Sequence, residues 1–146
     1  MKDLTRVLQD YCADNNIVYH YGIKRHLNLL EGNQVEGEVY MLHEPSTLVP
    51  DVNDTKTGHK SFTFTGGLFL TVKSTIDMPY FKEKQVTDDV SKFTLNIEPM
   101  KQRMIVIEKD LMCMGIDIKT SIHETTNLLD FNCDGVFVKY TIVTYE

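Results

Sequence analysis

Five histidines are the side chains of this 146-residue sequence best suited to acid/base or metal chemistry: His20, His26, His43, His59 and His123. No two of them stand four residues apart, the spacing that places two imidazoles on one helix face in zinc proteases. His20 and His123 lie in segments predicted to be strands, where the two rings could meet across a sheet. Such a pair would form a metal or acid/base site, and the default alternative is packing at a strand edge or between strands.

Two further patterns resemble ligand-binding loops, but each lacks residues that its motif requires. Asp51, Asn53 and Thr55 alternate like the oxygen ligands of a calcium loop, but Lys56 replaces the glycine expected next and no glutamate closes the loop. The glycine pair 66–67 lacks the lysine and hydroxyl residue that follow in a phosphate-binding loop. We therefore expect no metal site and no cofactor site in either segment.

Three cysteines, Cys12, Cys113 and Cys133, are odd in number and widely spaced, so they predict reduced thiols rather than disulfides or a metal pair. Cys113 falls at the end of a predicted helix, where the negative end of the helix dipole disfavours a thiolate. We expect it to be packed in the interior. No nucleophile triad or carboxylate pair is recognisable, so the sequence predicts no catalytic residue and no enzyme.

The first half of the chain predicts one helix followed by strands. Leu4, Val7, Leu8 and Tyr11 have the spacing of an amphipathic helix over residues 2–14. Strand-forming residues fill 17–21, and apolar and polar residues alternate over 35–43. Residues 61–75 carry apolar side chains at even positions on both sides of the glycine pair, which predicts one long strand bent there.

Two polar stretches, residues 44–60 and 77–92, interrupt this pattern. The first holds two prolines, a glycine and many turn-forming residues. A compact domain rarely contains about 15 residues without regular structure unless they serve binding. We therefore predict that 44–60 is a long interaction loop and that 77–92 is a second, polar loop.

The second half predicts a helix and a closing hairpin. A stripe with steps of three and four residues predicts a helix over 97–114, with Asn96 as N-cap and Gly115 at its end. The stripe consists of Ile97, Met100, Met104, Ile107, Leu111 and Met114. Alternation from Ile116 and again over 136–145, with turn-forming residues at 132–135, predicts an antiparallel β-hairpin.

Together these elements predict a single domain, 1–146, of the α+β class. We expect a mostly antiparallel β-sheet with two helices packed on one face, in the order α-β-β-β-α-β-β, ending in a β-hairpin. Fifteen Lys and Arg against 21 Asp and Glu leave a net charge of −6 without a block of either sign. This excludes the concentrated basic footprint of a protein that grips phosphate backbones. No apolar run approaches the length of about 20 residues that spans a bilayer, so we expect no membrane partner.

This order of elements resembles the tail terminator and head-tail completion (connector) proteins of tailed bacteriophages. The resemblance covers most of the chain as a pattern, and its specific part lies in 95–145, with the helix start IEPM at 97–100 and the segment FNCDGVFV at 131–138. It implies a structural virion protein, made in the host cytoplasm, that forms a homo-oligomeric ring, a hexamer or larger, at the tail or head-tail junction. It also implies contacts with tail-tube or connector proteins, and no catalytic, cofactor or metal residue.

The resemblance further implies that DNA passes through the ring without sequence-specific binding. The acidic balance is compatible with that, because the wall of a DNA conduit should not hold phosphates. A cyclic ring needs heterologous contacts, in which one patch meets a different patch on the next copy. We assign this contact to the 44–60 segment and to sheet-edge residues. The candidate interface residues are Pro45, Leu48, Val49, Pro50, Val52 and His59.

Two other classes of function remain open from the sequence. A small-molecule-binding or enzymatic α+β domain would use the sheet face, with Tyr19, Tyr21, His20 and His123 as polar handles. An accessory adaptor would bind one partner through the methionine-rich helix around Met104. A ring protein should form a closed oligomer of fixed order, whereas an enzyme should lose activity when a handle such as His20 is replaced.

Overall fold

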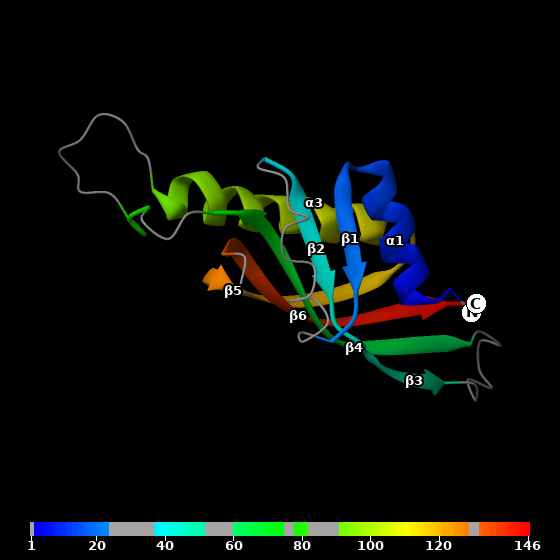
Figure 1. The fold of residues 1–146 in the computed structure, drawn as a ribbon. Helices are drawn as coiled ribbons and strands as arrows, with labels where there is room; N and C mark the ends of the chain where they lie inside the picture. Colours follow the sequence, from blue (N-terminus) through cyan, green and yellow to red (C-terminus); the bar gives the residue numbers. More distant parts are fainter. Residues whose placement is uncertain (1, 24–36, 52–59, 75–77, 82–90, 129–131) are drawn as a thin grey trace.

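The structure is a computed structural model of the chain. It describes residues 2–23, 37–51, 60–74, 78–81, 91–128 and 132–146. In chain order the elements are α1 (Leu4–Asp14), β1 (Ile17–Tyr21), β2 (Val39–His43), β3 (Thr47–Asp51), β4 (Ser61–Lys73), η1 (Phe93–Ile97), α3 (Glu98–Cys113), β5 (Asp117–Leu128) and β6 (Cys133–Tyr145). Figure 1 shows them coloured along the chain.

The fold belongs to the α+β class: in the described ranges, two α-helices accompany a six-stranded sheet (Figure 1). The strand order is β1-β2-β4-β6-β5, and β3 pairs with β4 outside this path. All pairs are antiparallel except β1 with β2, which are parallel. The predicted fold class is confirmed, with four strands rather than three between the helices.

The additional strand, β3, lies inside the segment predicted to be a loop at 44–60. Its residues pair with the first half of β4, from Thr47 opposite Thr65 to Asp51 opposite Ser61. Sequence patterns missed it because Pro50 and the polar neighbours disfavour a strand. Proline is tolerated on an edge strand, which needs ladder hydrogen bonds on one side only. The remainder of the predicted loop, 52–59, lies outside the described residues.

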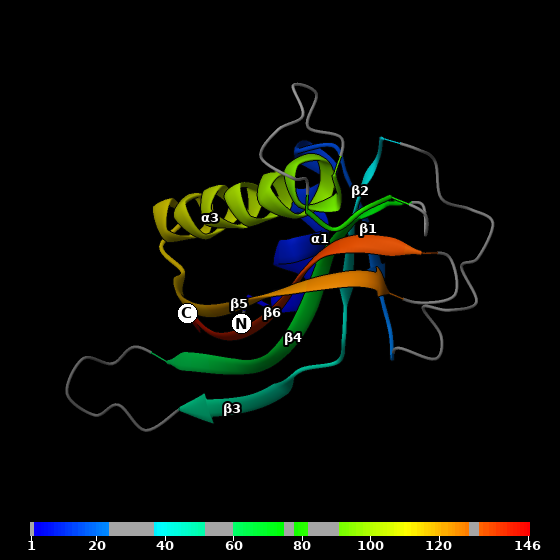
Figure 2. The ribbon, with the colours of Figure 1, turned by 90° about the vertical axis from the view of Figure 1, so that its left-hand side faces the viewer.

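β4 organises the sheet. It pairs with β6 along its whole length, while β3 and β2 share its other side, one after the other. The strand is bent along its length (Figure 2), and Gly66 and Gly67 lie in the middle of its sequence. A Cβ atom on Gly67 would lie 2.7 Å from a ring carbon of Phe137, so glycine lets that ring lie against the strand. The prediction of one long bent strand is confirmed.

The first helix and the first two strands follow the prediction closely. Asp3 caps α1 by accepting a hydrogen bond from the backbone N–H of Thr5 at 3.0 Å. β1 has the predicted bounds of 17–21. β2 is shorter than the predicted 35–43 and begins at Val39, because Gly37 takes a turn conformation with φ of +87°. Residues 35 and 36 are outside the described residues.

α3 follows directly on the π-helical turn η1. The predicted N-cap Asn96 lies inside η1 instead, and its side-chain amide donates to the carboxylate of Asp134 at 3.0 Å. The stripe is buried at Ile97, Met100, Met104, Ile107 and Leu111. Met114 is 50% exposed, because the helix ends at Cys113 and Gly115 closes it with φ of +78°.

β5 and β6 form the predicted antiparallel hairpin. The predicted turn at 132–135 is only partly a turn: Asn132 has φ of +51°, but Cys133 already begins β6. Gly135 is therefore a strand residue rather than a turn residue. Its Cα is so close to β4 that a Cβ would lie 2.1 Å from the carbonyl oxygen of Leu70, which explains the glycine by steric need.

Both helices cover the same face of the sheet, as predicted (Figure 2). Leu8 of α1 and Met104 of α3 belong to one core cluster with Leu70 of β4 and Val138 of β6. A smaller cluster lies on the opposite face: Tyr40, Leu42, Phe69 and Cys133. Burial of the apolar stripe of each helix against the sheet is thus the main contribution to the fold, at about 25 cal/mol per Å² of apolar surface.

Candidate functional site

The predicted interface residues that the structure describes are exposed. Pro45 precedes β3, and Leu48, Val49 and Pro50 lie within it, in a strand whose five residues are all exposed. Leu48 is 39% exposed and Val49 is 56% exposed. The other two predicted residues, Val52 and His59, lie outside the described residues. We call the set Pro45, Leu48, Val49 and Pro50 the β3 edge.

The β3 edge continues the core face of the sheet. Leu48 stands opposite Phe64 and Pro50 stands opposite Phe62, and both phenylalanines belong to the core cluster. Leu48 and Pro50 themselves lie at the margin of the sheet, where their apolar side chains are exposed to solvent. Val49 points to the other face, because side chains alternate along a strand. The edge therefore presents apolar groups on both of its faces.

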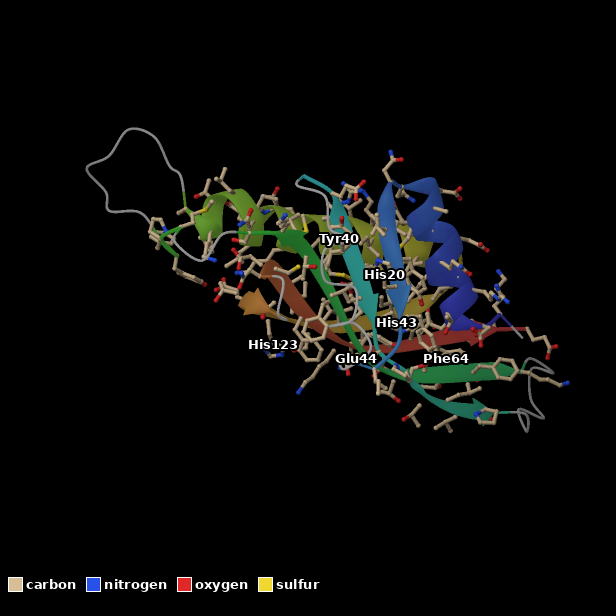
Figure 3. All side chains as sticks on the ribbon, viewed as in Figure 1. His20, Tyr40, His43, Glu44, Phe64 and His123 are labelled. Atoms are coloured by element: carbon tan, nitrogen blue, oxygen red, sulfur yellow. The ribbon has the colours of Figure 1, made fainter. Side chains whose placement is uncertain are left out.

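A buried histidine holds the base of this edge (Figure 3). His43 is the last residue of β2 and is fully buried. Its Nδ1 lies 2.7 Å from the hydroxyl of Tyr19 and its Nε2 lies 2.5 Å from the hydroxyl of Tyr140. The next residue, Glu44, donates its backbone N–H to the carbonyl of Gly67 at 3.1 Å. The chain thus enters β3 from an anchored position on three strands.

The imidazole of His43 is neutral in this cluster. Burial lowers its pKa from 6.5 to about 4, and the Asp3 carboxylate opposes this only in part. A neutral imidazole has one donor and one acceptor nitrogen, so one tyrosine hydroxyl donates to the ring and the other accepts from it. Burial also raises the pKa of Tyr140 to about 12. These groups keep their protonation near pH 7 and serve to fix geometry.

His20 and His123, which from the sequence could meet across the sheet, lie far apart (Figure 3). His20 lies on β1 and His123 on β5, the first and last strands of the order β1-β2-β4-β6-β5. Four strand spacings of about 4.8 Å separate them, roughly 19 Å. His20 stacks on Tyr40, with ring centroids 6.3 Å apart, and His123 packs by Phe137. Packing, the default alternative, is what the structure shows.

The four polar handles of the alternative small-molecule site are also divided between the two faces of the sheet. Tyr19 and Tyr21 lie beside His43 on the helix-covered face. His20 points to the opposite face, because it alternates with them along β1. A groove of about 550 Å³ does lie at the bend of β4, but none of the four handles lines it. Its charged residues are Glu44, Lys119 and Lys139.

A buried ion pair near η1 was missed by sequence analysis. Lys92, assigned to the polar loop 77–92, donates its Nζ to Asp134 at 3.1 Å, and the side chains are 4% and 0% exposed. Ser74 and Asn96 join the cluster through hydrogen bonds of 3.2 and 3.0 Å. The four side chains connect η1 to β4 and β6. A buried charge is stable only beside its partner, so the ion pair holds the start of the helical segment against β6. We therefore assign this cluster to positioning α3.

The cysteines are free thiols. Cys12 and Cys133 are buried, and burial raises the pKa of the Cys133 thiol to about 11. Cys113 is exposed, so the expectation that it packs in the interior is wrong. The side of α3 that contains Leu111 is buried against the sheet, and Cys113 lies on the outer side of the helix. Within the described ranges, no group of three or more His, Cys, Asp and Glu side chains is placed to hold a metal ion.

Among the described residues, neither helix has the length and apolar character needed to cross a bilayer. Comparison of the chain with protein-family models, with curated proteins and with solved structures found no match.

Proposed function

We propose that this protein is the subunit of a homo-oligomeric ring at the tail or head-tail junction of a tailed bacteriophage, as a tail terminator or completion protein. The observation that carries the proposal is the β3 edge, an exposed strand with apolar side chains on both faces. Isolated soluble domains normally protect such edges with charges, bulges or a covering segment. On β3, Pro50 and Asp51 are such devices, but Leu48 and Val49 stay exposed between Thr47 and Pro50, and a neighbouring subunit is the natural cover.

The anchored base of the edge supports a role in assembly. Surfaces that are held in their bound geometry lose little conformational entropy on association, and this strengthens binding. His43, fixed between Tyr19 and Tyr140, and the hydrogen bond from Glu44 to Gly67 provide this preorganisation. The β3 edge is thus an organised surface rather than a free loop.

The charge of the chain fits a conduit for DNA. The net charge is −6, and two lysines of the sheet, Lys119 and Lys139, lie in a groove that also contains Glu44. Because such a wall neutralises few phosphates, DNA binding gains little free energy from counterion release, and the duplex is not retained. We place tail-tube or connector proteins on the two open sides of the ring, and we assign the protein no catalytic activity and no cofactor.

The oligomeric state of the purified protein tests the proposal. Native mass measurement across a concentration series should give one closed species, a hexamer or larger, in equilibrium with monomer. Leu48→Glu should weaken association by at least about 30-fold, as expected for loss of a contact worth about 2 kcal/mol. Gln9→Glu, which adds the same charge on the exposed side of α1, is the matched control and should assemble normally.

A wild-type protein that stays monomeric at every concentration would contradict the ring. The genes beside its own test the phage assignment separately. Genes for portal, capsid and tail-tube proteins are expected there, and a neighbourhood of metabolic genes would count against a virion role even for a ring-forming protein.

A further inference from the structure

A second apolar surface lies on the outer side of α3. Ile105, Val106 and Met112 are 59%, 53% and 53% exposed, although the opposite side of the helix already supplies its core stripe. β-Branched residues such as Ile105 and Val106 have below-average helix propensity, so the helix itself gains nothing from them at exposed positions. A contact beyond the monomer would give these exposed residues a role.

These residues form a strip of two short rows on the outer side of the helix. Ile105 and Met112 are seven residues apart, as are Val106 and Cys113, and the two rows lie about 100° apart around the helix axis. The strip rises about 10 Å along the helix axis. Lys109, which is exposed, lies between the upper and lower pairs. We call Ile105, Val106, Lys109, Met112 and Cys113 the α3 strip.

We propose that the β3 edge of one copy docks on the α3 strip of the next copy. This inference rests on the proposed ring and names its second surface. The two surfaces belong to different elements and lie on opposite sides of the molecule, α3 above the sheet and β3 at its lower margin in Figure 2. A contact between two unlike patches is heterologous, and repetition of a heterologous contact generates a ring when the rotation closes.

Size and charge match between the two surfaces. The apolar segment from Leu48 to Pro50 spans about 7 Å along the strand, within the length of the α3 strip. Glu44 and Asp51 flank the apolar residues of the edge and are the charged residues described between 44 and 51. Lys109 lies at the centre of the strip. The edge is therefore acidic and the strip carries a lysine, so the two surfaces attract each other, whereas two edges brought together would repel.

A mixing experiment tests the heterologous contact. Leu48→Glu damages the edge and leaves the strip intact, while Ile105→Glu damages the strip and leaves the edge intact. Both positions are exposed, so both variants should fold and unfold like the wild type. Each variant alone should be monomeric under conditions in which the wild type forms the closed oligomer. Mixed in equal amounts, they should form a heterodimer, because one undamaged edge and one undamaged strip remain.

The outcomes separate this inference from the proposed function. A closed wild-type oligomer that Ile105→Glu leaves unchanged would overturn the docking on α3 and keep the ring. Two monomeric variants that give no heterodimer on mixing would also overturn it, since this indicates like patches meeting. A monomeric wild type would overturn both proposals. Capture of an unrelated protein by the strip, with an intact ring in Ile105→Glu, would assign α3 to a different partner.

Cross-linking provides a second measurement that does not depend on disrupting the interface. Val49→Cys introduces a thiol on the edge, and the native Cys113 is exposed at the end of the strip. A short bis-maleimide should join subunits into a ladder that ends at the ring order. The same variant with Cys113→Ser should give at least about tenfold less ladder, because Cys12 and Cys133 are fully buried and unreactive. Equal ladders in both would contradict the contact.

Discussion

At the scale of single residues, His43 connects the core to the β3 edge. It is fully buried, contacts two tyrosine hydroxyls and ends β2 just before the chain turns toward β3. Because its pKa is lowered to about 4 by burial, the folded protein holds it neutral while an unfolded chain binds a proton near pH 6.5. The stability of the fold around the base of the β3 edge therefore depends on pH through this histidine.

The sign of this coupling predicts acid sensitivity. Above pH 6.5 both states are neutral at His43 and the free energy of unfolding is unaffected. As pH falls from about 6.5 to about 4, the unfolded state gains the proton first, so stability falls by about 3 kcal/mol from this group. Urea unfolding of wild type and His43→Gln at several pH values should show the variant losing less stability over this range.

The exposed His123→Gln is the control and should follow the wild type. Parallel pH profiles for wild type and His43→Gln, from pH 7 to pH 4, would contradict a buried neutral imidazole. The glutamine keeps one donor and one acceptor, so its loss of stability at pH 7 should be about 1 kcal/mol, the usual net value of a hydrogen bond.

At the scale of elements, β4 and β6 lie closer together at Gly135 than any side chain allows. A Cβ there would lie 2.1 Å from the Leu70 carbonyl oxygen and 2.9 Å from the Cα of Thr71, both backbone atoms that cannot rotate away. Gly115, which ends α3, has the opposite situation: φ is +78° and a Cβ would meet nothing within 4 Å. Glycine is thus required at position 135 because there is no space for a side chain, and at position 115 because of the backbone conformation.

We predict different costs for the two Gly→Ala variants. Gly115→Ala should lower the free energy of unfolding by about 1 kcal/mol, the cost of a left-handed conformation for alanine. Gly135→Ala should cost about 3 kcal/mol or more, because the central strand pair must move apart. Chemical denaturation of the two variants beside the wild type measures this, and equal losses would contradict the close approach of β6 to β4.

Elements with strong periodicity could be predicted from sequence, and the elements that depend on a distant partner could not. The stripe through Met104 predicts α3 because five buried positions repeat at helical spacing, and the alternation across Gly66 predicts β4. β3 has no such pattern: Pro50 argues against a strand, and only the ladder to β4 produces one. Tertiary pairing outweighed local propensity there.

For the candidate site too, the sequence predicts what depends on a local segment and not what depends on distant partners. Leu48 and Val49 belong to a long polar segment, which predicts a contact surface, and the structure leaves both exposed. The pairing of Lys92 with Asp134, 42 residues away, has no local signal, since a lysine in a charged stretch is usually solvated. The exposed side of α3 has no clear signal in the sequence either, because its apolar residues alternate with polar ones such as Lys109.

At the scale of the whole molecule, the residues that the structure describes include two exposed apolar surfaces that we assign to assembly. The β3 edge lies at one margin of the sheet, and the α3 strip lies on the outer side of the helix layer (Figure 2). A net charge of −6 on each copy opposes close association, so subunit contacts must place opposite charges together. Lys109 and Asp51 are the residues we assign to that task.

A charge exchange tests this assignment. Lys109→Asp and Asp51→Lys should each weaken ring assembly several-fold, by about 1 kcal/mol for a contact between exposed charges. The double variant should recover most of the loss, because the attraction is restored with its sign reversed. Sedimentation equilibrium at low salt and at 1 M salt measures both effects; at 1 M the Debye length is about 3 Å and the differences should shrink. A double variant weaker than either single one would contradict the pairing.

The thirteen-residue ladder between β4 and β6 also determines how the molecule responds to force. The β3 edge is attached to the first half of β4, so a pull on that edge along the sheet is passed to β4. Hydrogen bonds in an antiparallel ladder run perpendicular to the strands, so this pull loads them in shear and they must break together. The same ladder pulled apart from one end would open one pair at a time. A subunit held by its β3 edge is therefore mechanically strongest along the direction of its own longest strands.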